Sequence, residues 1–161
     1  MINNNLKVLR AYVLGIAISL IVSLAIGALY KLSYIVPTIV TSIITYCLLY
    51  RGLWKIGRQE SEQKPAPPIN GIFYSSFFFG IAIFFEVVVA LCNLLKLQAL
   101  SGVFARAGIV WFYPFAGFYD EATFLAITPI ITVITVIWCL VSYYMGTKNI
   151  SVLQTIKNRL R

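Results

Sequence analysis

Glu86 is the one acidic side chain in a stretch of almost unbroken apolar residues, from position 71 to position 95. A run of this length with at most one charge is typical of a transmembrane helix, because about 20 residues span a bilayer. A carboxylate inside such a helix costs roughly 2.5–3.5 kcal/mol on insertion scales. We therefore expect Glu86 to face other protein groups or a water-filled path.

The helical repeat places Glu86 on the smaller, more polar face of this stretch, together with Asn93. Three interpretations of Glu86 stay open. It is a packing or assembly residue, bonded to threonines of neighbouring spans or to its own copies; it is an ion or proton site; or it reaches the outer interface. The threonines concerned form two hydroxyl-rich stripes, in the second and fourth spans, and include Thr41, Thr45, Thr132 and Thr135.

The rest of the sequence disfavours catalysis. The chain has no histidine, and so lacks the commonest general base and metal ligand. Its three cysteines all lie in apolar runs and form no CxxC pair. Asp120 and Glu121 are adjacent, and Glu60 and Glu62 fall in a segment that we interpret as a flexible connector. We therefore expect no enzymatic activity, no cofactor, no metal site and no direct nucleic-acid binding.

The composition indicates a membrane protein. Of the 161 residues, 60% are hydrophobic and only 11% are charged, whereas soluble domains have about 25% charged residues. Apolar runs predict four spans, at about 11–30, 32–50, 71–95 and 122–144. The first run is longer than the apolar region of a signal peptide, which has about 7–15 residues. The expected fold is all-α: a four-helix transmembrane bundle that forms a single membrane domain over residues 1–161.

Small residues recur at every fourth position of the first span and therefore share one face of the helix: Gly15, Ser19, Ser23 and Gly27. Such a face lets another helix approach closely, and a conduction path lined by these residues is the alternative. In the second span, Pro37 fits the first helical turn, where its missing N–H is not needed.

Two basic segments lie outside the spans. Residues 51–70 are expected to form a solvated cytosolic connector that includes a stiff, proline-rich stretch. Residues 147–161 have the spacing of a short basic amphipathic helix, which suits anionic lipid or a protein partner. The basic residues expected to make such contacts are Lys55, Arg58, Lys157, Arg159 and Arg161.

Residues 96–121 form the longest connection, which is rich in aromatic side chains. We interpret it as an outward-facing helix or loop at the bilayer surface, where such rings are enriched. A re-entrant loop and a docking patch for another protein are the alternatives. The aromatic residues concerned are Trp111, Phe112, Tyr113, Phe115, Phe118 and Tyr119.

The distribution of basic residues predicts the orientation. With four spans, all 13 lysines and arginines except Lys31, Lys96 and Arg106 fall on the side of the termini and the 51–70 connector. Because basic residues concentrate in cytoplasmic segments, both termini are expected in the cytoplasm.

In length, four-span layout and lack of enzymatic residues, the chain resembles the membrane subunit of the Kiwa antiphage defence system. The resemblance implies an oligomeric sensor in the bacterial inner membrane that works with a cytosolic protein. The sequence therefore favours a small homo-oligomeric subunit that senses or scaffolds. The alternative is an oligomeric ion or proton channel, or a small transporter, that uses Glu86.

Overall fold

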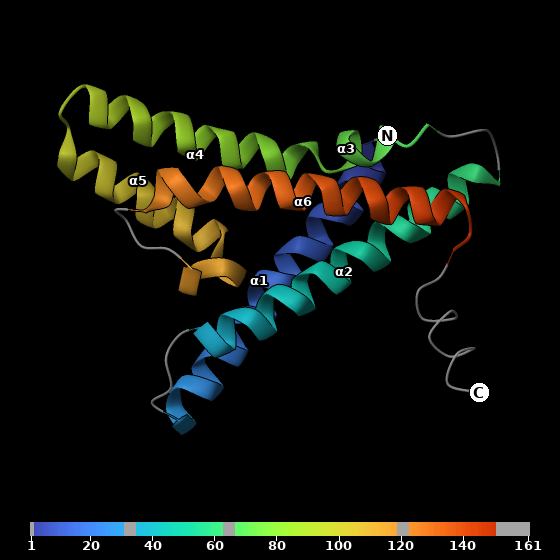
Figure 1. The fold of residues 1–161 in the computed structure, drawn as a ribbon, viewed down its shortest axis with the longest axis horizontal. Helices are drawn as coiled ribbons and strands as arrows, with labels where there is room; N and C mark the ends of the chain where they lie inside the picture. The colour runs from blue at the N-terminus through green and yellow to red at the C-terminus, as the bar shows by residue number, and fades with distance from the viewer. Residues whose placement is uncertain (1, 31–34, 63–66, 119–122, 151–161) are drawn as a thin grey trace.

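The computed structural model describes residues 2–30, 35–62, 67–118 and 123–150, and all regular structure in them is helical (Figure 1). The described elements are α1 (Ile2–Tyr30), α2 (Ile35–Ser61), α3 (Asn70–Tyr74), α4 (Ser76–Leu94), α5 (Gln98–Trp111), the short 3-10 helix η1 (Tyr113–Phe118) and α6 (Phe124–Thr147). The expected all-α fold is confirmed.

Three helices are long and apolar enough to cross a membrane. Their apolar stretches are Asn4–Ala25 in α1, Val36–Ser61 in α2 and Phe124–Thr147 in α6. A shorter apolar stretch, Phe78–Leu94, lies in α4. Large aliphatic side chains such as Leu24, Ile43 and Ile130 are exposed on the outer faces of these helices, as expected for surfaces that lie against lipid.

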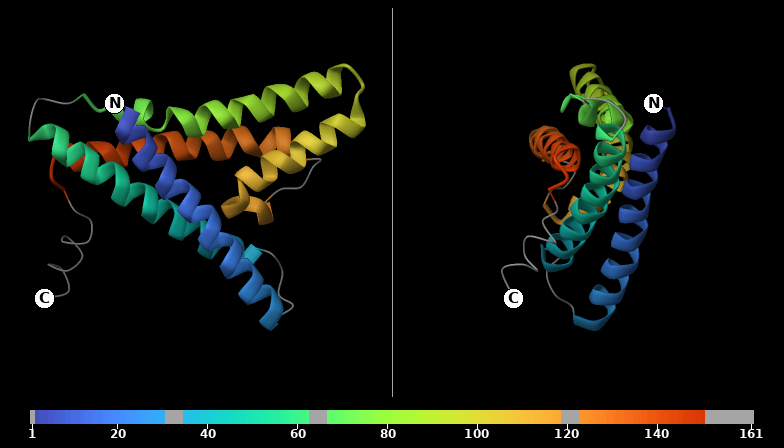
Figure 2. Two further views of the ribbon diagram at one scale, coloured as in Figure 1. Left: turned by 180° about the vertical axis from the view of Figure 1, so that it is seen from behind. Right: turned by 90° about the vertical axis from the view of Figure 1, so that its right-hand side faces the viewer.

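The helices form an open V that is joined at one end. Figures 1 and 2 show α1 beside α2 as one arm and α4 beside α6 as the other. The arms meet where α1 begins and where α2 and α6 end, and this is called the Glu60 end below. Away from it the arms diverge, and α5 and η1 lie between them. η1 packs against α1, α2 and α5.

Glycines allow the backbones of α2, α3 and α6 to approach closely at the Glu60 end. A Cβ atom on Gly57 would lie 2.4 Å from the carbonyl oxygen of Tyr143, and one on Gly146 would lie 2.3 Å from that of Trp54. A Cβ atom on Gly71 would lie 2.9 Å from the Cβ of Tyr143. Only residues without a side chain fit such contacts, which are typical of helix pairs in membranes.

The turn between α4 and α5 is closed by a Schellman motif. The N–H of Leu97 donates to the carbonyl of Cys92, at 2.8 Å, and that of Lys96 donates to the carbonyl of Asn93, at 3.0 Å. Lys96 has a φ of 59°, the left-handed conformation that this motif needs at its closing residue. The turn reverses the chain, so that α5 packs back along α4.

Two boundaries differ from those expected. α2 does not stop at residue 50 but continues to Ser61, because Leu53, Ile56 and Gly57 extend its buried face against α6. Residues 51–61 are therefore helix and partly core, and the interpretation of this part as a flexible connector is corrected. The 71–95 stretch is interrupted at Ser75, between α3 and α4.

The two prolines of the apolar helices take different positions. Pro37 lies in the first turn of α2, where the sequence predicts it. Pro129 lies within α6, one turn beyond its start at Phe124.

Candidate functional site

Glu86 lies on α4, half-buried, beside α6. Its one hydrogen bond among the described residues comes from Thr132 and is long, at 3.5 Å. The same hydroxyl lies 2.9 Å from the carbonyl oxygen of Thr128. Since a hydroxyl has a single proton to donate, the shorter contact competes directly with Glu86. The carboxylate therefore has no full-strength donor in the described part of the chain.

The other polar residues predicted for this site lie elsewhere. Thr135 donates to the carbonyl of Ile131, at 2.8 Å, and lies 3.2 Å from the hydroxyl of Tyr46. Asn93 accepts a 2.6 Å bond from Ser101 on α5. Of the predicted set, the structure brings only Thr132 to Glu86.

The hydroxyl stripe of α2 has a different role, because it holds η1. Ser42 donates to the carbonyl oxygen of Pro114, at 2.8 Å, and the Thr41 hydroxyl is shared between that oxygen, at 3.0 Å, and the carbonyl oxygen of Thr38, at 3.1 Å. The N–H of Gly117 donates to the hydroxyl of Thr38, at 3.0 Å. Backbone groups that are not paired within a regular helix need other hydrogen-bond partners. The stripe supplies those partners.

The small face of α1 packs against α2. A Cβ atom on Gly15 would lie 2.8 Å from the Thr45 hydroxyl oxygen, so a larger residue would not fit there. The Thr45 hydroxyl has no hydrogen-bond partner among the described residues. Ser19 is fully buried and donates to the carbonyl of Gly15, at 2.6 Å. Gly27 lies in α1, and its surroundings are not described.

Two of the aromatic residues of the predicted outward loop are buried in the core. Phe112 is fully buried and Phe115 is 2% exposed, so these two rings belong to the core and are not available as a docking patch. Phe112 packs edge-on against Phe78, with ring centroids 5.9 Å apart. The hydroxyl of Tyr12 donates to the carbonyl of Trp111, at 2.8 Å.

The remaining rings of this segment lie nearer the surface. Phe118 is exposed. Tyr113 lines a cavity of about 290 Å³ together with Ser23 and Thr38. Tyr119 lies outside the described residues.

Glu60, which lies in the segment predicted to be a connector, forms more hydrogen bonds than any other described acidic residue. One oxygen of Glu60 accepts from Asn4 on α1, at 3.2 Å, and from the hydroxyl of Tyr74 on α3. The other accepts from the hydroxyl of Tyr143 on α6, at 2.5 Å. Asn70 lies 3.5 Å from that same hydroxyl. This cluster, the Glu60 cluster, links four helices.

One sequence signal could have placed Glu60 on the buried face of α2, although it does not identify the partners of Glu60. Leu53, Ile56, Gly57 and Glu60 recur at the three- and four-residue steps of one helix face. The polar, proline-rich composition of residues 51–70 obscures this signal, because such a composition is typical of a solvated connector. The chemistry of the cluster is structural: hydroxyl and amide donors surround an acceptor and fix the helix ends relative to one another.

Two of the five basic residues that were predicted to contact lipid or a partner are described, and both lie on α2. Lys55 is exposed on α2. Arg58 forms an ion pair with Glu62, at 3.3 Å, and lies over the ring of Trp54, 5.6 Å from its centroid. The three basic residues of the tail lie outside the described residues: Lys157, Arg159 and Arg161.

No family model, curated protein or solved structure matches this chain. Within the described residues, no group of three or more histidine, cysteine or acidic side chains could hold a metal ion. Two carboxylates stand out: Glu86 on α4, which has one long hydrogen bond from α6, and Glu60, which accepts from three side chains at the helix ends.

Proposed function

We propose that the protein is an integral membrane subunit with four crossings and both termini in the cytoplasm. The length and apolar character of α1, α2 and α6 support three of the crossings. The 19 residues of α4 span about 28 Å, close to the thickness of the hydrocarbon core. The Glu60 cluster also supports this count, because α2 ends and α6 ends at the same side, and one further crossing must lie between them.

We propose further that the subunit works as a homo-oligomer assembled through α4. The observation that carries this proposal is the state of Glu86. Glu86 lies at the edge of an apolar exposed face of α4: Ile83, one turn before it, is 54% exposed, whereas Ala82 and Val89, also one turn away, are buried. A carboxylate at this depth is costly unless it is paired. A second copy of the chain packed on this face would exclude lipid from Glu86 and supply donors to it.

In this proposal the oligomer senses or scaffolds, and couples an event at the membrane to a cytosolic protein. A place in the bacterial inner membrane and in antiphage defence is proposed from the resemblance to the Kiwa membrane subunit alone. The second candidate, an ion or proton channel, is favoured by the contact between Glu86 and Thr132. These groups would line a shared path only in an oligomer.

The test is the mass of the assembly in mild detergent for the wild type and for Glu86→Leu. Glu62→Gln is the matched control, since Glu62 is an exposed acid at the Glu60 end. We expect an oligomer for the wild type and the control, and monomers for Glu86→Leu with an unchanged helical content. A monomeric wild type in native-lipid particles, or an unaltered Glu86→Leu oligomer, refutes assembly through Glu86.

Flux measurements in liposomes then separate the two functions. If the wild type conducts protons or cations and a Glu86→Gln variant that still assembles does not, the protein is a channel. Equal, background-level flux in both proteins would leave the sensing or scaffolding subunit.

A further inference from the structure

Four cations gather where α1 and α2 meet, close to the Glu60 end. They are Lys7 and Arg10 on α1, and Arg51 and Lys55 on α2, here called the α1–α2 basic patch. All four side chains are exposed. Lys7 and Arg10 are one turn apart on their helix, as are Arg51 and Lys55 on theirs, so each pair shares a face.

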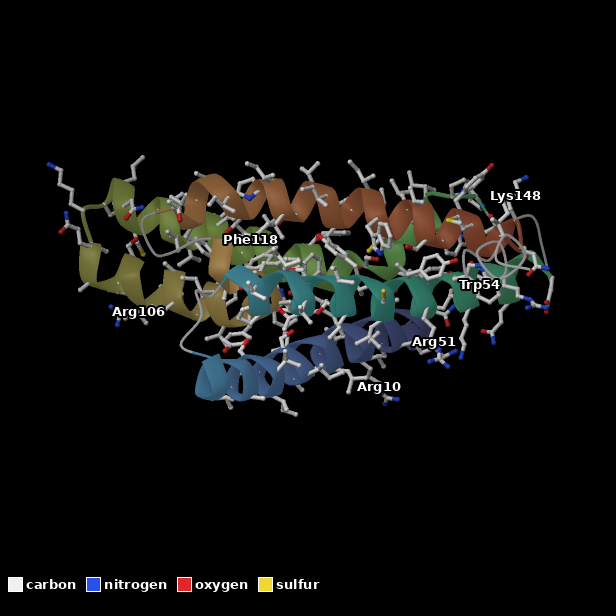
Figure 3. The ribbon with its side chains drawn as sticks, turned by 60° about the horizontal axis from the view of Figure 1, so that its bottom comes forward. Arg10, Arg51, Trp54, Arg106, Phe118 and Lys148 are labelled. Carbon is white, nitrogen blue, oxygen red and sulfur yellow. The ribbon has the colours of Figure 1, made fainter. Side chains whose placement is uncertain are left out.

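The two pairs lie next to each other because the helices touch at this level. A Cβ atom on Gly52 would lie 3.8 Å from the Cβ of Ala11. Arg51 and Arg10 are the chain neighbours of these two residues. Figure 3 shows both arginines at the same edge of the α1–α2 pair.

Neither described acid at this end neutralises the patch. Glu60 is occupied by Asn4 and by two tyrosine hydroxyls. Glu62 pairs with Arg58, on the neighbouring turn. In the described part of the chain, Lys7 has only a 3.5 Å contact with the Asn4 side-chain oxygen. The patch is therefore a concentration of positive charge with no described counter-charge.

An apolar surface begins directly beside the patch. On α1, Leu14 lies one turn from Arg10 and is 51% exposed. On α2, Cys47 lies one turn from Arg51 and is exposed, and Ile43 follows at 57% exposed. A nucleic acid or an acidic protein would match the charges alone. A phospholipid matches both parts, since its headgroup is anionic and its chains are apolar.

We propose that the α1–α2 basic patch binds the headgroup phosphate of an anionic phospholipid, whose acyl chains lie along the exposed faces of α1 and α2. Arg10 and Arg51 are the central ligands, because a guanidinium can donate two parallel hydrogen bonds to a phosphate. Lys7 and Lys55 add charge on either side. This site is independent of Glu86 and of assembly through α4.

The test is native mass spectrometry of the full chain in a nonionic detergent, with added lipid. Phosphatidylglycerol is compared with phosphatidylcholine of the same acyl chains. The double variant Arg10→Gln/Arg51→Gln removes the central ligands. Its matched control is Lys96→Gln/Lys148→Gln, which removes two exposed cations outside the patch. Circular dichroism melting checks that each protein is folded.

We expect the wild type and the control to retain phosphatidylglycerol in preference to phosphatidylcholine. The double variant should bind phosphatidylglycerol roughly 10- to 30-fold more weakly, the effect of two basic residues at an anionic surface. Equal retention of the two lipids by the wild type, or an unchanged affinity of the double variant, overturns the proposal. If the double variant does not fold, each single variant is measured. A decrease of less than threefold in phosphatidylglycerol affinity for both single variants would also overturn the proposal.

Inorganic phosphate distinguishes a lipid site from a free phosphate site. For a lipid site, millimolar phosphate should leave the retention of phosphatidylglycerol unchanged, because the apolar contacts are absent from the free ion. Full displacement by phosphate would instead show a phosphate site without a lipid component and would refute the lipid assignment.

Discussion

Tyr143 shows how much of the Glu60 cluster depends on single donors. Its hydroxyl donates to Glu60 at 2.5 Å, while its ring packs near that of Tyr74, with centroids 5.9 Å apart. Replacement by phenylalanine keeps the ring and removes the donor. Because hydrogen bonds to charged groups contribute about 1.5–3 kcal/mol, Tyr143→Phe should lower the free energy of unfolding by about 2 kcal/mol, as measured by denaturant titration in micelles.

The neighbouring tyrosine provides the control for this prediction. Tyr144 is 43% exposed and lies outside the cluster. Tyr144→Phe should therefore change the free energy of unfolding by less than about 0.5 kcal/mol, as is usual for surface positions. Equal effects of the two substitutions would show that the hydroxyl of Tyr143 has no special role.

Among single residues, Glu86 can be predicted from the sequence, but its contacts cannot. Glu86 is conspicuous because its charge interrupts an apolar run. Four threonines in the two hydroxyl-rich stripes are equally plausible partners by sequence. Only the packing of α4 on α6 shows that Thr132 is the one in contact with Glu86. The partners of Glu60 cannot be predicted from the sequence, because Asn4 and Tyr143 are 56 and 83 residues away, and no local pattern indicates such contacts.

Among the elements, the crossing of α2 and α6 depends on glycine. A methyl group on Gly146 would meet the carbonyl oxygen of Trp54 at 2.3 Å, which forces the helices apart. Overpacking of this kind costs about 1–3 kcal/mol. We expect Gly146→Ala to lower the midpoint of thermal unfolding in detergent by several degrees.

Gly80 is the matched control, since it is also helical and a Cβ atom there would have nothing within 4 Å. Alanine is favoured over glycine within a helix by roughly 0.5–1 kcal/mol. Gly80→Ala should therefore leave the midpoint unchanged or raise it. A drop of similar size in both variants would mean that the α2–α6 contact is not the cause.

The apolar runs predict the three long apolar helices well, because length and hydrophobicity are local properties. The ends of the helices and the path of residues 96–118 are less accessible. α2 continues through four charged residues, since only one of its faces needs to be apolar there. The aromatic segment has the composition of an interfacial loop, yet Phe112 and Phe115 fill the V between the arms. Composition does not distinguish rings that lie at an interface from rings in a core.

The topology of the whole molecule can be tested with two single cysteines. Glu62 lies just after α2, and Lys96 lies in the turn that follows α4. In a chain whose three native cysteines are replaced, Glu62→Cys and Lys96→Cys should react with a membrane-impermeant maleimide from opposite sides of sealed vesicles. Both should react with a permeant maleimide. Labelling of both from one side would mean that α4 does not cross.

The Glu60 cluster also sets an order of events while the chain is being made. Asn4 has already left the ribosome when Glu60 appears, and Tyr74 follows shortly afterwards. Tyr143, whose hydroxyl bonds the second carboxylate oxygen, is added 83 residues later. Since synthesis runs from the N-terminus, the cluster stays incomplete until Tyr143 of α6 has been translated. Its closure thus waits for the last of the four helices that it links.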